Sequence, residues 1–437
     1  MTADAQAGVF VSAEQSAVID SFLSSHADEL LAFRRHMHAH PELSGVEDET
    51  TEAIVNRLQV AGLEPEILTT GTGVVCDVVG PRSASVSANA ADPGAAPDDD
   101  VGGPVGTLGR VPVVALRADI DALAMSDQST TPYRSTVPGV AHACGHDVHS
   151  TIVLGAGLLL AQLMAAPDAP NGRVRLIFEP SEEMVPGGAV DVIGSGYLEE
   201  VDAIFGLHCD PKIDVGHLGL RPGPITSAAD LVEIVLSGPG GHTARPEQTV
   251  DLVEVAARIA LEVPTLLGGN GLNGELRLVF GSLRAGDAAN VIPSTARLTG
   301  SMRTPSHTAW EEGPARLRAA IAQVVDPTGA KWELHHRRGV PPVVNDPVAT
   351  ELAMRAVTSA LGTDALVATG QSWGGDSFGW YLERAPGSYL RLGTHSPESI
   401  GPRLDLHAGS FDVDEAAIPA GIRVLVTTAL MWLRSHN

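Results

Sequence analysis

The sequence predicts an α/β protein: a mainly parallel, helix-flanked sheet interrupted by an inserted small α+β domain. Apolar runs such as VPVVALRAD and VRLIFEP alternate with helical patterns, which is typical of a parallel sheet covered on both faces. From about Arg221 the order becomes strand, helix, strand, strand, helix, strand, which is typical of a ferredoxin-like sandwich. The chain has 437 residues, of which 44% are hydrophobic, enough to build two cores.

The first part of the chain supplies most elements of the large sheet. Apolar residues at helical spacing predict a helix over residues 14–39 and another from about Asp48 to Gly62. Strands are expected in GVVCDVVG, VPVVALRAD, VRLIFEP and AIFGLHC, with a helix after Gly145. Residues 81–110 are rich in Ala, Ser, Pro, Gly and Asp, so we expect an exposed loop there.

Two proline-rich joints, at residues 221–224 and 339–342, bracket the inserted pattern. They predict an inserted domain at residues 222–339 and a discontinuous first domain formed by residues 1–221 and 340–437. The first domain is expected to end in a long helix from about Glu415.

Composition and charge exclude several classes of partner. A formal net charge of -25 opposes binding to nucleic acid or to an anionic membrane. We find neither a run of about 18 apolar residues nor the basic and apolar stretches of a signal peptide. The three cysteines form no recognisable disulfide framework. We therefore expect a cytoplasmic protein that acts on a small molecule.

The run AHACGHDVH, at residues 141–149, is the densest group of potential metal ligands in the chain. A thiolate at Cys144 and an imidazole at His146 are strong ligands for a borderline-soft divalent ion such as zinc or manganese. The alternative is that these histidines only line the following helix. We assign His142 and His149 to such a supporting role.

Acidic residues and one histidine stand where predicted strands end. Glu182 and Glu183 follow VRLIFEP, Asp119 ends VVALRAD, and His208 ends AIFGLHC. The carboxyl ends of parallel strands meet at one edge of a sheet, so we expect these residues to share a site. One of the two glutamates could bind metal while the other takes a proton from a nearby water. Two acids on a solvated loop are the alternative interpretation.

His407, in LDLHAGSF near the C-terminus, is a further candidate ligand. On its own it is more simply explained as a structural histidine. With the other candidates it raises the number of ligands to five, which suits two ions about 3.5 to 4 Å apart better than one tetrahedral ion.

Taken together, the chain resembles the peptidase M20 family. It is most similar to the amidohydrolase branch, which includes hippurate hydrolases, N-acyl-amino-acid amidohydrolases, auxin-conjugate hydrolases and N-acetyldiaminopimelate deacetylases. The resemblance rests on nine motifs in the family's order: FRRHMHAHPELSGVEDET, LRADIDAL, GVAHACGHDVHS, IFEPSEE, GLHCDP, GPGGHTARP, NVIPSTARLTGSMR, GGDSFGWY and LHAGSF.

The resemblance implies a role for each matching residue. The family's metal ligands match Cys144, His146, Glu183, His208 and His407, and its general base matches Glu182. Asp119 matches an acid that orients a metal-ligating histidine. His242 matches a histidine that reaches from the inserted domain into the partner subunit's site and steadies the oxyanion. Asn290 and Arg303 match residues that hold the substrate's carboxylate.

The implied protein is a metal-dependent amidohydrolase that cleaves N-acyl-amino acids, including those with aromatic acyl or amino-acid groups. Two Mn²⁺ or Zn²⁺ ions per subunit are expected, with Co²⁺ or Ni²⁺ possible in vitro. The inserted domain would serve as a lid and dimerisation domain in a homodimer or larger homo-oligomer.

Departures from the family pattern bear on the acyl pocket. The chain has DALAM where DALPI is expected and GGDSF where SEDF is common. Two alternatives remain open: a dipeptidase or aminoacylase-like peptidase with the same metal core, and a binding homologue without catalysis.

Overall fold

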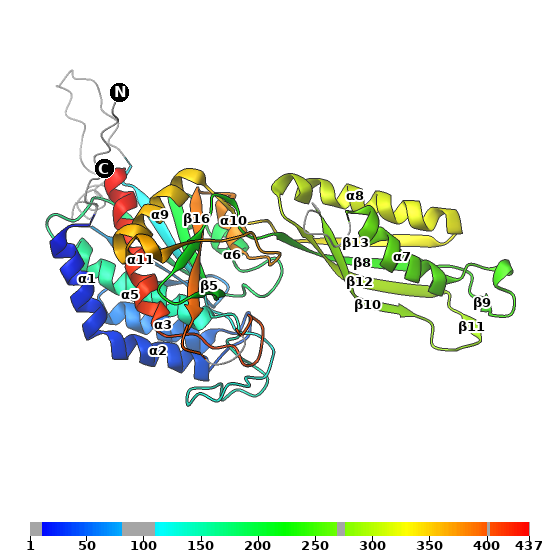
Figure 1. The fold of residues 1–437 in the computed structure, drawn as a ribbon, viewed down its shortest axis with the longest axis horizontal. Helices are drawn as coiled ribbons and strands as arrows, with labels where there is room; N and C mark the ends of the chain where they lie inside the picture. Colours follow the sequence, from blue (N-terminus) through cyan, green and yellow to red (C-terminus); the bar gives the residue numbers. More distant parts are fainter. Residues whose placement is uncertain (1–10, 81–109, 269–275, 400–402, 437) are drawn as a thin grey trace, which may run out of the picture.

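The structure is a computed structural model that describes residues 11–80, 110–268, 276–399 and 403–436. The predicted loop at 81–110 lies almost entirely outside these residues. Two lobes lie side by side in Figure 1, each built on its own sheet. The large lobe contains an eight-stranded sheet with strand order β1-β2-β4-β3-β5-β16-β6-β15. Its strands are β1 Glu66–Ile67, β2 Val74–Val79, β3 Val113–Asp119, β4 Arg173–Glu179, β5 Ala203–Asp214, β6 Leu218–Leu220, β15 Leu366–Ala368 and β16 Gly387–His395.

The centre of the large sheet is parallel. Strands β4, β3, β5 and β16 pair in parallel, whereas β2 and β6 run antiparallel to their neighbours β4 and β16. Helices cover both faces of this sheet. This arrangement confirms the predicted mixed α/β class, with β2 as an antiparallel exception that its apolar run did not reveal.

The two faces of the large sheet have separate cores. Along β3, Val114 and Leu116 belong to one core while Val113 and Ala115 belong to the other, as alternation along a strand requires. The first core packs against α1 Ala13–Ser25, α2 Ala27–Ala39, α3 Asp48–Val60, α5 His146–Met164, α9 Pro347–Leu361 and α11 Ala417–Ser435. The second packs against α6 Ala189–Gly194 and α10 Phe378–Leu382.

Helices α5 and α11 are each long and apolar enough to cross a membrane, but 89% and 78% of their apolar windows are buried inside the protein. Both pack on the sheet and serve as core helices of the large lobe. Helix α11 begins at Ala417, close to the predicted start at Glu415.

The helix expected over residues 14–39 is two helices, which is a correction. Helix α1 ends at Ser25, His26 lies between the helices, and α2 starts at Ala27. Asp28 and Glu29 stand in the first turn of α2, where acidic side chains stabilise a helix N-terminus. The start of α2 could not be seen in the sequence because apolar residues continue at helical spacing from α1 into α2.

The small lobe is formed by the part of the chain from β8 to β13. It contains a four-stranded antiparallel sheet of order β10-β12-β8-β13. Its strands are β8 Ala228–Ser237, β10 Arg277–Ala285, β12 Thr295–Thr304 and β13 Lys331–Val340, and its helices are α7 Leu252–Leu266 and α8 His307–Val325. Both helices cover one face of the sheet (Figure 1). This order matches the predicted inserted pattern.

Short elements complete the chain. A ribbon of β9 Gly241–His242 and β11 Val291–Ile292 projects from the end of the small lobe away from the large lobe (Figure 1). Strands β7 Gly223–Pro224 and β14 Val344–Asn345 pair with each other where the chain passes between lobes. Short 3-10 turns occur at Pro246–Gln248, Asp326–Thr328 and Thr363–Ala365. The domain boundaries at 222 and 339 stay a prediction.

Arg34 ties the N-terminal helices to the rest of the large lobe. Its guanidinium is 1% exposed and lies 2.8 Å from Asp147 on α5 and 2.9 Å from Asp412. It also contacts Glu415, at 3.2 Å, just before α11. One buried cation therefore forms ion pairs with carboxylates from two separate parts of the chain.

We expect Arg34→Ala to lower the free energy of unfolding by about 3–5 kcal/mol, because it leaves the buried carboxylate of Asp147 without its cation. Arg35→Ala is the matched control: Arg35 binds the same Glu415 but is 45% exposed, so its loss should cost less than about 1 kcal/mol. Urea unfolding followed by circular dichroism measures both changes. Equal losses for the two variants would contradict a special role for Arg34.

Candidate metal centre

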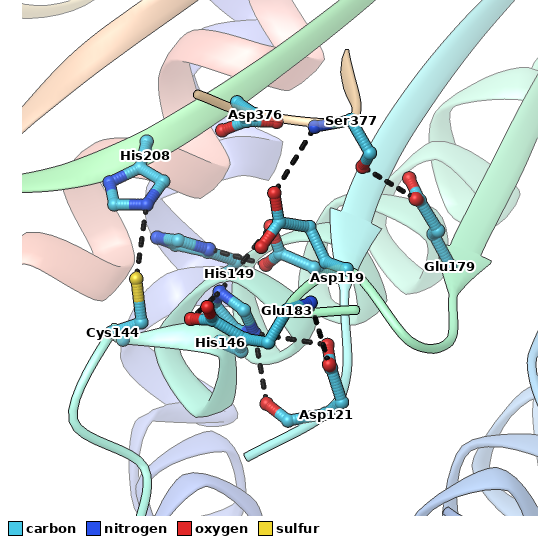
Figure 2. A network of polar contacts seen from close by, with 12 residues as sticks. Asp119, Asp121, Cys144, His146, His149, Glu179, Glu183, His208, Asp376 and Ser377 are labelled. Carbon is cyan, nitrogen blue, oxygen red and sulfur yellow. Dashed lines mark hydrogen bonds and ion pairs between the residues drawn. The ribbon is translucent and has the colours of Figure 1, made fainter. Parts of the chain in front are cut away.

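Four candidate ligands converge at the carboxyl ends of the central strands in Figure 2: Cys144, His146, Glu183 and His208. Helix α5 starts at His146, directly after Cys144 and Gly145, and faces the ends of β3 and β5. Gly145 has a φ of 89°, and a Cβ there would stand 2.7 Å from the Sγ of Cys209. Only glycine permits both this left-handed conformation and this close approach.

The five predicted ligands lie together. The Sγ of Cys144 is 3.4 Å from Nε2 of His208, and Oε1 of Glu183 is 3.2 Å from Nε2 of His407. The same Glu183 oxygen lies 3.9 Å from Nε2 of His146. Donor atoms of Cys144, His146 and His208 form one group within 4.8 Å of one another, and those of Cys144, Glu183 and His407 form a second.

Two of these donor atoms are buried without a hydrogen-bond partner among the described residues: Nε2 of His146 and Oε1 of Glu183. Buried polar atoms usually have a partner, so unsatisfied atoms that point at one another need an explanation. A divalent cation would satisfy both. Thiolate, imidazole and carboxylate are also the ligand types that zinc and related ions take. The donor set therefore fits a metal centre.

Backbone carbonyl oxygens orient the imidazole rings of His146 and His208 through their Nδ1 atoms. Nδ1 of His146 lies 2.9 Å from the carbonyl oxygen of Asp121, and Nδ1 of His208 lies 2.7 Å from that of Cys209. Both leave Nε2 turned toward the other candidate ligands. The Asp121 carboxylate accepts hydrogen bonds from the backbone N–H of Glu183, at 3.0 Å, and from the hydroxyl of Ser44, at 2.6 Å.

The geometry gives Asp119 a different contact from the one expected. Its carboxylate is bonded at 2.6 Å to Nδ1 of His149, while its nearest approach to His146 is 3.7 Å, at Nε2. Asp121, rather than Asp119, contacts the rear nitrogen of His146. His149 in turn accepts a hydrogen bond from the backbone N–H of Cys209, so its ring links Asp119 to β5.

Glu182 lies among the candidate ligands: its carboxylate forms a further group with donor atoms of His146 and Glu183, all within 4.8 Å of one another. Its Oε1 accepts a hydrogen bond of 3.1 Å from the backbone N–H of Ser377. Burial raises the pKa of Glu182 well above its ordinary value, and the neighbouring Asp376 carboxylate raises it further. Burial likewise raises the pKa of the Cys144 thiol. A nearby cation would favour the charged form of each group.

A buried guanidinium lies behind Glu182 and Asp119. Arg117 donates to Glu179 at 2.7 Å, to Asp119 at 2.6 Å and to the hydroxyl of Ser377 at 2.9 Å. The Ser377 hydroxyl donates to Glu179 at 2.6 Å. Sequence reasoning missed Arg117 and Glu179, although a charged residue inside an apolar strand, as in VVALRAD and VRLIFEP, was a usable signal.

Two residues at this site have strained backbones. Ser181 and His407 are the non-glycine residues with positive φ in the described chain, at 56° and 59°. Ser181 precedes the two glutamates, and its N–H is held by the buried carboxylate of Glu47 at 2.7 Å. Such strain costs about 1–3 kcal/mol per residue and tends to gather at functional sites.

The remaining predicted residues lie in the small lobe. His242 and Asn290 are exposed, and His242 belongs to the ribbon that projects away from the large lobe (Figure 1). Their own chain therefore does not bring them to the ligand cluster. Arg303 is different: it lies near the end of β12 that adjoins the large lobe, where its Nη1 would be 3.2 Å from a Cβ at Gly375.

The supporting histidines differ in their contacts. His149 is bonded on both ring nitrogens, as described above. His142 is buried with neither ring nitrogen bonded to any described residue, and burial lowers its pKa to about 4.

Known proteins resemble this chain over nearly its whole length. The model of peptidase family M20/M25/M40 matches residues 115–431. The N-acetyl-L-cysteine deacetylase of Bacillus subtilis is 33% identical over 417 residues, covering 95% of this chain and 91% of that protein. The Bacillus subtilis YXEP protein, described as a dinuclear metal-binding peptidase of the M20 family, superposes with a TM-score of 0.76 at 30% identity and covers 95% and 99% of the two chains.

A third relative is much longer. The Rhodococcus jostii protein named "Putative glutamate--cysteine ligase 2-3" is 40% identical over 406 residues, which is 92% of this chain but 47% of that protein. This chain thus spans about half the length of that relative and most of the length of the Bacillus deacetylase. The family match and the full-length relatives together show that the chain belongs to peptidase family M20/M25/M40, as a hydrolase of amide bonds.

Proposed function

We propose that this protein is a dinuclear metal-dependent amidohydrolase that cleaves N-acyl-amino acids into a carboxylic acid and an amino acid. The observation that carries the proposal is the convergence of one thiol, three imidazoles and two carboxylates, one of which, Glu182, also accepts a hydrogen bond from the backbone N–H of Ser377. The proposed ligands are Cys144, His146, Glu183, His208 and His407. Mn²⁺ and Zn²⁺ are the proposed ions, two per subunit, and the proposed location is the cytoplasm.

Held by Cys144, His146, Glu183, His208 and His407, two divalent ions would supply Lewis acidity and lower the pKa of a bound water towards neutrality. The chain's own residues do the rest. Glu182 accepts the proton of the attacking water and returns it to the amine nitrogen that leaves. The N–H of Ser377 holds one Glu182 oxygen in place during this transfer. Asp121 orients the ring of His146, and Asp119 acts through His149.

Three residues of the small lobe complete the proposed site. Arg303 would bind the substrate's carboxylate, as the resemblance implies, and its place beside Gly375 supports this. The ribbon of β9 and β11, which contains His242 and directly follows Asn290, projects away from the large lobe (Figure 1). We therefore propose that His242 stabilises the oxyanion in the partner subunit of a homodimer or larger homo-oligomer, where Asn290 also contacts the substrate.

Metal dependence and substrate class can be tested together. We expect protein reconstituted with Mn²⁺ or Zn²⁺ to hydrolyse N-acyl-amino acids of varied acyl length, to lose turnover in a chelator, and to regain it when metal is restored. Metal should also raise the melting temperature, because it binds only the folded donor set. Released amino acid and thermal unfolding measure these effects. Faster hydrolysis of free dipeptides would instead favour the peptidase alternative.

The two adjacent glutamates form a matched pair of variants. Glu182→Gln should lower kcat by about 10²–10⁴-fold, because it removes the proton acceptor, while both metals remain bound. Glu183→Gln should lower metal content as well as turnover. Metal analysis of the purified variants and steady-state kinetics separate the two effects. A near-normal rate for Glu182→Gln would contradict the role of Glu182 as the general base.

The oligomer proposal predicts complementation between inactive variants. In mixed dimers of Glu182→Gln and His242→Ala, one of the two sites receives both intact residues, so a randomly exchanged equal mixture should recover roughly a quarter of wild-type activity. Subunit exchange is followed with differently tagged chains, and each variant mixed with itself is the control. No recovery despite proven exchange would place the action of His242 elsewhere.

A further inference from the structure

Two arginines face each other at the end of the small lobe that adjoins the large lobe. Arg277 on β10 is the direct cross-strand partner of Arg303 on β12. Their neighbours Leu278 and Met302 point into the core beneath α7 and α8. Because side chains alternate along a strand, both guanidiniums lie on the open face of the sheet.

Both arginines lie against the large-lobe loop formed by residues 373–377, whose last residue donates a hydrogen bond to Glu182. The guanidinium carbon of Arg277 is 4.1 Å from the centre of the Trp373 ring. Arg303 reaches Gly375 in the same loop, and Ser377, two residues further on, donates to Glu182. The five consecutive residues 373–377 therefore contact both arginines and also the proposed general base.

Neither guanidinium has an acidic partner within the part of the chain that the structure describes. Nε of Arg277 is buried without any hydrogen-bond partner there. The acid that most affects Arg303 is Asp230, but its carboxylate is already bonded to Trp310, His336 and the N–H of Gly339. A second pair of opposed arginines on these strands, Arg284 and Arg297, differs, because Arg297 pairs with Glu233 and Arg284 is exposed.

Two like charges directly opposite each other destabilise a sheet. Burial adds to the cost, and it lowers the pKa of Arg303. The chain has 53 acidic and 28 basic residues, so carboxylates are plentiful elsewhere. Two partly buried, unpaired arginines beside the proposed active site are best explained by an anionic ligand that binds between them.

We propose that Arg277 and Arg303 form a paired anion site, and that the amino-acid part of the substrate carries two carboxylates, as in N-acyl-glutamate or N-acyl-aspartate. This inference rests on the proposed N-acyl-amino-acid hydrolysis. Arg303 would grip the α-carboxylate and Arg277 the side-chain carboxylate, each through the paired N–H groups of a guanidinium. The Cβ atoms of directly opposite residues are about 5 Å apart. This separation is comparable to that between the two carboxylates of a glutamate or aspartate. Stacking on Trp373 holds the plane of Arg277.

Kinetics with paired substrates test the proposal. N-acetyl-L-glutamate is compared with N-acetyl-L-glutamine, which differs in the second carboxylate alone, and the benzoyl forms are run alongside. Arg277→Gln should lower kcat/KM for the glutamate substrates by about 10- to 100-fold and leave the glutamine substrates nearly unchanged. Arg284→Gln is the matched control, because Arg284 is an exposed arginine on the same strand, further from the large lobe, and should change neither value.

Binding supplies a second measurement. Titration calorimetry of N-acetyl-L-glutamate and N-acetyl-L-glutamine is carried out on metal-loaded Glu182→Gln protein, with and without Arg277→Gln. The second change should weaken glutamate binding by a similar factor and leave glutamine binding nearly unchanged. Equal losses for both ligands, or no loss, would overturn the two-carboxylate assignment. Absence of turnover on every acyl-amino acid would instead contradict the proposed function, and the binding comparison would still decide the role of Arg277.

Discussion

The site is organised around the buried guanidinium of Arg117. It is a cation inside a parallel sheet, and it is tolerable there because Glu179 and Asp119 neutralise it and Ser377 accepts a further hydrogen bond. Burial opposes its charge, but the carboxylates of Glu179 and Asp119 hold its pKa well above the ordinary value. Without this cation, two carboxylates at adjacent strand ends would repel each other. The edge of the sheet would then lose the arrangement that places Asp119 behind His149 and Ser377 beside Glu182.

Sequence reasoning reached most of the site for a physical reason. Parallel strands bring their carboxyl ends to one edge, so Asp119, Glu183 and His208 could be placed together from apolar runs and end positions alone. Cys144 and His146 were visible because such ligand types are rare at that density. The roles of His242 and Asn290 came from the family resemblance, and they remain proposals because the fold carries both away from the cluster of their own chain.

What the sequence concealed depends on three-dimensional contacts between distant segments. Asp121 was missed because spacing alone cannot show that its carbonyl oxygen and its carboxylate both face the rear nitrogen of His146. The break at His26 was hidden because apolar spacing continued through it. The antiparallel pairing of β2 was hidden because a strand buried in a sheet reads as the same apolar run in either direction.

The net charge of the whole chain bears on how the site binds an anionic substrate. At a net charge of -25, the protein repels an anionic substrate at long range, so affinity has to come from local cations. The segment from Gln371 to Ser377 brings those local elements together: it bonds to the linker at Thr226 and Ser227, carries Trp373 beneath Arg277, and donates to Glu182. A carboxylate held by the small lobe would thus sit against the same loop that positions the base. In the proposed two-carboxylate site, anion binding would therefore be linked to the base by one short segment of directly contacting residues.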